Sequence, residues 1–123
     1  MWTRKKPKKL STVERQRREH ARTIVTGKVT SWSAQMDIRT GRVAIRNQRT
    51  RWGSASELGN LNFNWRVAYL PEHIADYIVI HELAHLREMN HSSAFWEIVE
   101  QHCPEYRTHR RWLRTHGHRY QTV

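Results

Sequence analysis

Cysteine is nearly absent from this 123-residue chain, since Cys103 is the only one. A single cysteine excludes a framework of internal disulfides, and we therefore expect a reducing compartment, the cytoplasm. No segment approaches the roughly 18 apolar residues of a membrane-spanning helix, so we expect no membrane partner. The basic stretch Met1–Leu10 is not followed by an apolar segment, so the sequence gives no indication of a secretory signal peptide.

Acidic residues are also scarce, because 11 Asp and Glu face 22 Lys and Arg and leave a net charge of +11. Residues 1–22 hold nine basic and two acidic side chains, and residues 23–70 hold seven and two. Residues 71–123 hold six and seven. A field of this sign attracts polyanions, so nucleic acid is a candidate partner of the basic N-terminal half. A solubilising tail without a partner is the alternative.

The length favours one domain. We divide the chain into a basic N-terminal arm, residues 1–22, and a folded domain, residues 23–123. Ser11 with Glu14 three positions later forms a capping-box pattern, which predicts a short helix in the later part of the arm. We find no internal repeat and no low-complexity linker.

Alternating apolar and polar residues indicate strands over residues 23–66. Residues 36–38 and 43–45 both alternate, and Thr40-Gly41 between them offers a turn, so a hairpin is predicted there. Residues 61–66 alternate in the same way and predict a half-buried strand with one polar face. We expect a substrate to add to a sheet edge, for which residues 60–66 are a candidate. An internal strand with solvated asparagines is the alternative for this segment.

Helical periodicity begins at Pro71, a residue favoured at the first position of a helix. We predict a helix over about Pro71–Met89, with Ile74, Ile78 and two histidines on one face. A second helix should begin after Ser92 or Ser93 and reach about residue 102. A third is expected over residues 104–117.

The predicted helix carries the motif H-E-x-x-H at residues 81–85. Histidines at positions i and i+4 project side by side, so His81 and His85 can bind one metal ion. Glu82 lies one step around the helix, where it can hydrogen-bond a metal-bound water. Two solvent-facing histidines are the alternative, and the apolar neighbours of the motif disfavour it.

A third protein ligand would leave one coordination position open for chemistry. His91 follows His81 by ten residues, and Asn90 allows the chain to reverse just before it. We therefore predict His91 as the third ligand. A carboxylate from the following helix, Glu97 or Glu100, is the alternative.

Several groups of residues carry a resemblance to a known family: R-W-G-S at 51–54, G-N-L-N at 59–62, Y-I-V-I-H-E-L-A-H-L at 77–86, N-H-S at 90–92, F-W at 95–96, Pro104, Tyr106, Trp112-Leu113 and Gly117. Together they resemble the YgjP-like metallopeptidase domain, a group related to the SprT-like zincins. The resemblance covers residues 49–117 well and residues 23–48 weakly. One departure is Ala55, which stands where the family usually has cysteine.

The resemblance implies an α+β, zincin-like fold in which a small antiparallel sheet packs on the active-site helix, with further C-terminal helices. It implies a zinc-dependent peptidase with Zn²⁺ held by His81, His85 and His91, and Glu82 as the catalytic acid and base. Zinc would lower the pKa of its bound water, and Glu82 would take a proton as that water attacks a peptide carbonyl. Glu82 would then protonate the leaving amine.

The expected substrate is a protein or peptide. Four side chains are candidates to stabilise the oxyanion, with none preferred: Arg51, Tyr106, His109 and His116. A metal-dependent ribonuclease of similar histidine geometry is a second hypothesis, although Glu82 favours peptide hydrolysis. A nucleic-acid-associated zinc-binding module is a third, but it would need a fourth protein ligand.

Overall fold

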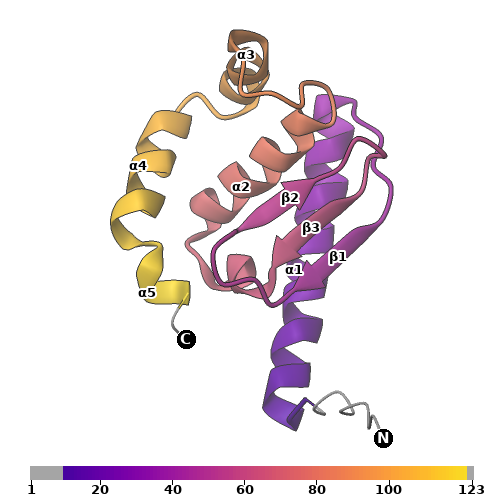
Figure 1. Cartoon of the computed structure of the whole chain (residues 1–123), viewed down its shortest axis with the longest axis vertical. Coiled ribbons are helices and arrows are strands. Elements are labelled where there is room, and N and C mark those ends of the chain that lie inside the picture. Colours follow the sequence, from indigo (N-terminus) through magenta and orange to yellow (C-terminus); the bar gives the residue numbers. More distant parts are fainter. Residues whose placement is uncertain (1–9, 122–123) are drawn as a thin grey trace, which may run out of the picture.

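The computed structural model describes residues 10–121, which form one long helix, a small sheet and a set of C-terminal helices (Figure 1). The elements are α1 (Thr12–Met36), β1 (Val43–Arg46), β2 (Gly53–Ala55), β3 (Leu61–Asn64), the 3-10 helix η1 (Trp65–Tyr69), α2 (Glu72–His85), α3 (Ser93–His102), α4 (Tyr106–His116) and α5 (His118–Gln121). The α+β class predicted from the sequence is confirmed.

Helix α1 begins at the predicted capping box. The Ser11 hydroxyl accepts from the Glu14 amide at 3.1 Å, and the Glu14 carboxylate accepts from the Ser11 amide at 3.2 Å. The helix is 25 residues long. The prediction of strands over residues 23–36 is therefore wrong.

The buried residues of α1 explain its length. Ala21, Val25 and Val29 recur every four residues and are buried against the rest of the protein, as is Met36. The β-branched residues in this segment favour strands locally, but packing of one helical face outweighs that preference. The proposed boundary after residue 22 falls inside this continuous helix.

The predicted hairpin over residues 36–45 is also wrong, because Met36 ends α1 instead of pairing as a strand. Asp37 terminates the helix with a left-handed backbone, φ 54° and ψ 51°. Only the second half of the predicted hairpin, β1, forms a strand. The basic residues before position 10 lie outside the described residues.

The sheet has the strand order β1-β3-β2 and is mixed. β2 pairs antiparallel with β3, whereas β1 pairs parallel with it, so the expected antiparallel sheet is corrected for β1. A parallel pair needs a crossover connection, and residues 47–60, which include β2, supply it. The candidate edge strand, residues 60–66, contains the central strand β3, so the alternative of an internal strand is confirmed. The edge strand that contacts α2 is β2.

Helix α2 is the central element, with α1 behind it and the sheet and α4 beside it (Figure 1). Ten of its 14 residues are buried. It ends at His85, earlier than predicted, because the amides of residues 86–88 turn back onto the carbonyls of Leu83 and Ala84. Asp76 ties it to α1, accepting from Lys28 Nζ at 2.8 Å and Trp32 Nε1 at 3.2 Å.

Asn64, which is fully buried at the end of β3, holds the loop that precedes β2. Its side-chain amide donates to the carbonyls of Gln48 and Arg51, and its oxygen accepts from the Arg66 amide. Buried polar groups are retained when they are satisfied in this way. The Asn64 side chain therefore fixes the position of the loop that carries Arg51 and leads to Gly53.

The C-terminal helices follow the predicted order. Ser92 caps α3 by accepting from the Phe95 amide at 3.4 Å, and Gly117 ends α4, as the sequence indicates. The short α5 was not predicted. Within residues 10–121, no helix combines the length and apolar character needed to cross a bilayer.

Candidate metal centre

Three histidines meet at the C-terminal end of α2. His81 and His85 project from one face of the helix, and His91 comes from the connection to α3. One ring nitrogen from each lies within 4.8 Å of the others, and the Nε2 atoms of His81 and His91 are 3.4 Å apart. In residues 10–121, this is the one group of three or more potential ligands gathered closely enough to hold a metal ion.

The distance between the Nε2 atoms of His81 and His91 is one that a zinc ion can bridge. Tetrahedral zinc with Zn–N bonds near 2.1 Å places its ligand nitrogens about 3.4 Å apart, the separation between His81 and His91. Burial, with His85 and His91 adding to the effect, lowers the pKa of His81 to about 3. The pKa of His85 is also lowered by burial. The neutral rings that result are the form that binds metals.

Hydrogen bonds behind the rings orient them. The Nδ1 atom of His85 donates to the Glu88 carbonyl at 3.2 Å, and Nδ1 of His81 lies 3.4 Å from the Tyr77 hydroxyl. Burial raises the pKa of Tyr77 to about 12, which keeps that hydroxyl protonated. Partners of this kind fix the tautomer and direct Nε2 towards a metal. This role of Tyr77 was not predicted from the sequence, although its position four residues before His81 could have indicated it.

Aromatic side chains from α3 support the histidines from the other side. The Phe95 ring stacks on His85 with centroids 4.4 Å apart and planes 26° apart. The planes of the Trp96 and His91 rings are 26° apart, and their centroids are 5.8 Å apart. The F-W pair at the start of α3 therefore packs directly on the candidate ligands.

Glu82 lies beside the histidines and is only 7% exposed. Burial raises its pKa to about 7, while the positive charge of Arg51 opposes that rise. Gly53 packs against it so closely that a Cβ atom at residue 53 would lie 3.0 Å from Glu82 Cγ and 3.2 Å from Oε2. Gly53 belongs to the R-W-G-S motif, but its contact with Glu82 was not predicted from the sequence.

A cleft opens over these residues, formed by two pockets of about 210 and 350 Å³. Both pockets are lined by Arg51, Gly53, His81 and Glu82. The larger pocket adds the outer residues of β2 and the other two histidines, and the smaller one reaches Tyr77 and Leu113. Glu82 is thus set in the wall of a cleft that the three histidines also line.

The remaining candidates lie elsewhere. Glu97 and Glu100 are exposed on α3 and are outside the group of ligand atoms. Among the four oxyanion candidates, Arg51 lines the cleft. The other three make packing contacts: Tyr106 with Trp96, His109 with His73 and Tyr77, and His116 with Trp112.

The histidine cluster next to a small sheet and a cleft agrees with the zincin-like fold expected from the sequence, and solved structures of similar fold are metallopeptidases. The chain matches the YgjP-like, metallopeptidase domain family over residues 3–116, and it belongs to that family. The family predicted from the sequence motifs is confirmed.

Solved structures agree with this assignment. The metallopeptidase zymogen abylysin of Pyrococcus abyssi is 32% identical, with a TM-score of 0.57, over 63% of this chain and 77% of that one. The zymogen jannalysin of Methanocaldococcus jannaschii is 21% identical, with a TM-score of 0.59, over 68% and 90%. The second likeness supports the fold alone. A comparison with curated proteins found no match.

Proposed function

We propose that this protein is a zinc-dependent metallopeptidase that hydrolyses peptide bonds in a protein or peptide substrate. Membership of the family supplies the class of activity. One observation supports zinc and its proposed ligands. Three histidine nitrogens lie within 4.8 Å of one another, beside the buried carboxylate of Glu82. Histidine nitrogens in this number suit zinc and leave room for a further ligand.

In this proposal His81, His85 and His91 hold the zinc ion. When bound, zinc supplies a Lewis acid that polarises the scissile carbonyl and lowers the pKa of water. Glu82 takes the proton from the attacking water and delivers it to the leaving amine nitrogen. Tyr77 and Glu88 keep the imidazoles oriented through their hydrogen bonds to Nδ1.

The edge strand β2 forms the other wall of the cleft. We propose that an extended substrate pairs with this strand, since a free sheet edge binds a peptide through main-chain hydrogen bonds. Ala55, at the end of β2, contributes only a small side chain to this wall of the cleft. The smaller pocket beside Leu113 would then receive one substrate side chain.

Nucleic acid stays a proposed partner of the N-terminal half. Arg15 and Arg22 are exposed along α1, which supports an electrostatic contact with a polyanion. We also keep the proposal of a cytoplasmic location, because the single cysteine, Cys103, is unpaired and buried.

Removal of the metal tests the proposed function. Dialysis against a chelator should abolish cleavage of a fluorescently labelled unfolded protein, and added Zn²⁺ should restore it. Mg²⁺ should not restore it, because three imidazoles suit zinc and oxygen ligands suit magnesium. Labelled RNA in parallel reactions checks the ribonuclease hypothesis. Zinc-dependent cleavage of the RNA with no cleavage of the protein would refute the peptidase proposal.

The contact between Gly53 and Glu82 gives a second prediction. Gly53→Ala should lower kcat/KM by about tenfold or more, because the new methyl group displaces the carboxylate and small misplacements of catalytic groups are costly. Zinc content, measured by mass spectrometry, should not change. Gly27→Ala is the matched control, since a Cβ atom there meets nothing within 4 Å. Equal activity of the two variants would show that Gly53 does not position Glu82.

A further inference from the structure

Four arginines line one face of α4 and form a shallow pocket of about 240 Å³. We call this surface the arginine face; it consists of Arg107, Arg110, Arg111 and Arg114. All four side chains are exposed, and in the described part of the chain none of them forms an ion pair with an acidic side chain. Like charges three and four positions apart destabilise a helix, so the protein keeps this face at a cost.

The net charge of the C-terminal half does not reveal this concentration of arginines. Residues 71–123 are nearly balanced overall, but all seven of their acidic residues precede Tyr106. Residues 106–121 contain five arginines and no acidic residue. The positive charge of the folded domain is therefore not confined to the N-terminal half, and α4 carries a local excess that an average over the C-terminal half conceals.

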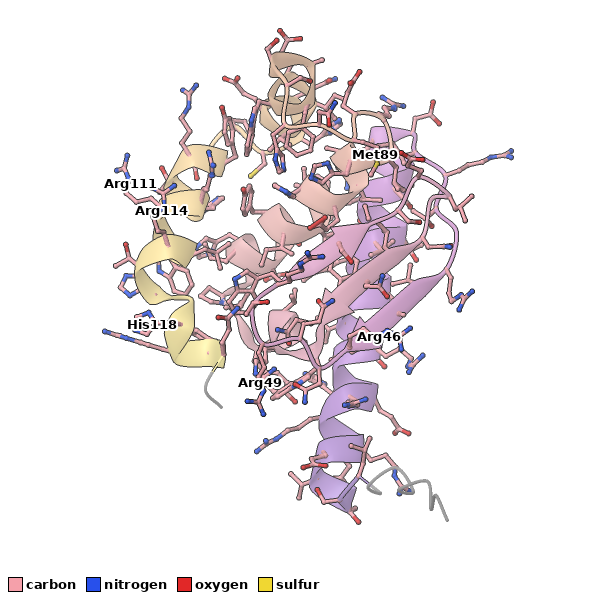
Figure 2. The ribbon with its side chains drawn as sticks, viewed as in Figure 1. Arg46, Arg49, Met89, Arg111, Arg114 and His118 are labelled. Carbon is pink, nitrogen blue, oxygen red and sulfur yellow. The ribbon has the colours of Figure 1, made fainter. Side chains whose placement is uncertain are left out.

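One aromatic ring connects the arginine face with the candidate metal ligands. The Arg110 guanidinium lies 4.8 Å from the centre of the Trp96 ring, and the same ring is parallel to His91. The charge of Arg110 also helps to lower the pKa of His81. Figure 2 shows Arg111 and Arg114 on the outer side of α4. The face thus starts beside the histidines and leads away from them.

We propose that the arginine face binds acidic side chains of the peptide substrate on one side of the scissile bond. This inference rests on the proposed peptidase function and adds a substrate class to it. Arg107 and Arg114 are seven positions apart, about 10 Å along the helix axis. That length corresponds to about three residues of an extended peptide. Guanidinium groups match carboxylates in shape and charge, and Trp96 holds one of them in place.

A peptide fits this surface better than a nucleic acid does. One end of the face lies against Trp96, which packs on His91, and within the cleft the only acidic lining residue is Glu82. Arg51 adds positive charge on the opposite wall. A substrate segment that leaves the cleft over Trp96 therefore meets cations and no competing carboxylates of the protein.

Peptide cleavage tests the inference. Three peptides share one cleavable core and carry a flank of three identical residues, which are Glu, Ser or Lys. Each peptide is made in two forms, with the flank either before or after the core. The zinc-loaded protein should cleave the Glu peptide with about tenfold higher kcat/KM than the Ser peptide, on one side only, as a few exposed ion pairs allow. The preference should fall as salt is added.

A charge reversal separates recognition from folding. The double variant Arg110→Glu/Arg111→Glu should prefer the Lys flank over the Glu flank, an effect that a merely structural role would not produce. Arg39→Glu/Arg42→Glu is the matched control, with the same change in charge on two exposed arginines. These lie in the connection between α1 and β1, across the molecule from α4 (Figure 1), and the control should keep the Glu preference.

Binding gives a readout that does not depend on turnover. Fluorescence anisotropy with the zinc-loaded Glu82→Gln variant should show tighter binding of the Glu peptide than of the Ser peptide. Cleavage of all three peptides at equal rates overturns this inference and leaves the peptidase proposal intact. No cleavage, with equal binding, overturns both. A single-stranded oligonucleotide that binds through Arg110 and Arg111, while the Glu peptide does not bind, would identify the face as a nucleic-acid surface and overturn the inference.

Discussion

Glu82→Gln should reduce peptide hydrolysis by about a thousandfold while the protein keeps its zinc. The substitution preserves the size of the side chain and removes the group that accepts the proton, and general bases contribute between a hundredfold and ten-thousandfold to rates. Zinc should remain bound because the three histidines hold it. The measurement pairs kcat/KM on an unfolded protein substrate with zinc content per chain, in the wild type and the variant.

Glu88→Gln is the control for this experiment. Glu88 is close in sequence, but it contacts His85 through its backbone carbonyl, which the substitution retains. Its activity should stay near that of the wild type. If Glu82→Gln cleaved substrate at the wild-type rate, proton transfer by Glu82 would have no part in the reaction. If the variant lost its zinc, the experiment would report on metal binding instead, and Glu82 would have to be reassigned.

His91→Ala should weaken zinc binding by at least about a hundredfold and abolish activity with it. The side chain is exposed, so its removal leaves no cavity in the core and the metal-free protein should melt at an unchanged temperature. Zinc raises the Tm of a protein that binds it in the folded state. Titration of zinc during thermal unfolding should therefore stabilise the wild type strongly and the variant little.

The same titration decides between the candidate third ligands. Glu97→Gln and Glu100→Gln should behave as the wild type, since both carboxylates are exposed and outside the histidine group. The opposite pattern, in which His91→Ala keeps tight zinc and one of the glutamine variants loses it, would replace the histidine with a carboxylate. That result would leave His81 and His85 in place and change only the third ligand.

The core of the site could be predicted because local geometry determines it. Four residues along a helix bring His81 and His85 together whatever the rest of the fold does, and that helix was evident from its periodicity. His91 follows after a short connection that leaves little freedom. Gly53 could not be found in this way, because its contact with Glu82 depends on how a strand from another part of the chain meets α2.

The errors in the fold have a related origin. The segment 23–36 is rich in residues that favour strands, and its helical form depends on burying Val25 and Val29 against distant elements. The pairing of Val43 with Leu61 joins positions 18 residues apart, and nothing local distinguishes the parallel from the antiparallel choice. The arginines of α4 are visible in the sequence, but a net charge counted over the 53 residues from 71 to 123 does not reveal their concentration.

Helix α1 limits how the protein can be shortened. The charged residues from Glu14 to Arg22, which the sequence places in the N-terminal arm, belong to the same helix as Ala21, Val25 and Val29, which pack into the interior. A truncation at residue 23 would remove the capping box and nearly half of α1, and α1 would then cover less of the α2 surface. Anyone designing a minimal catalytic fragment should therefore place its start no later than Ser11.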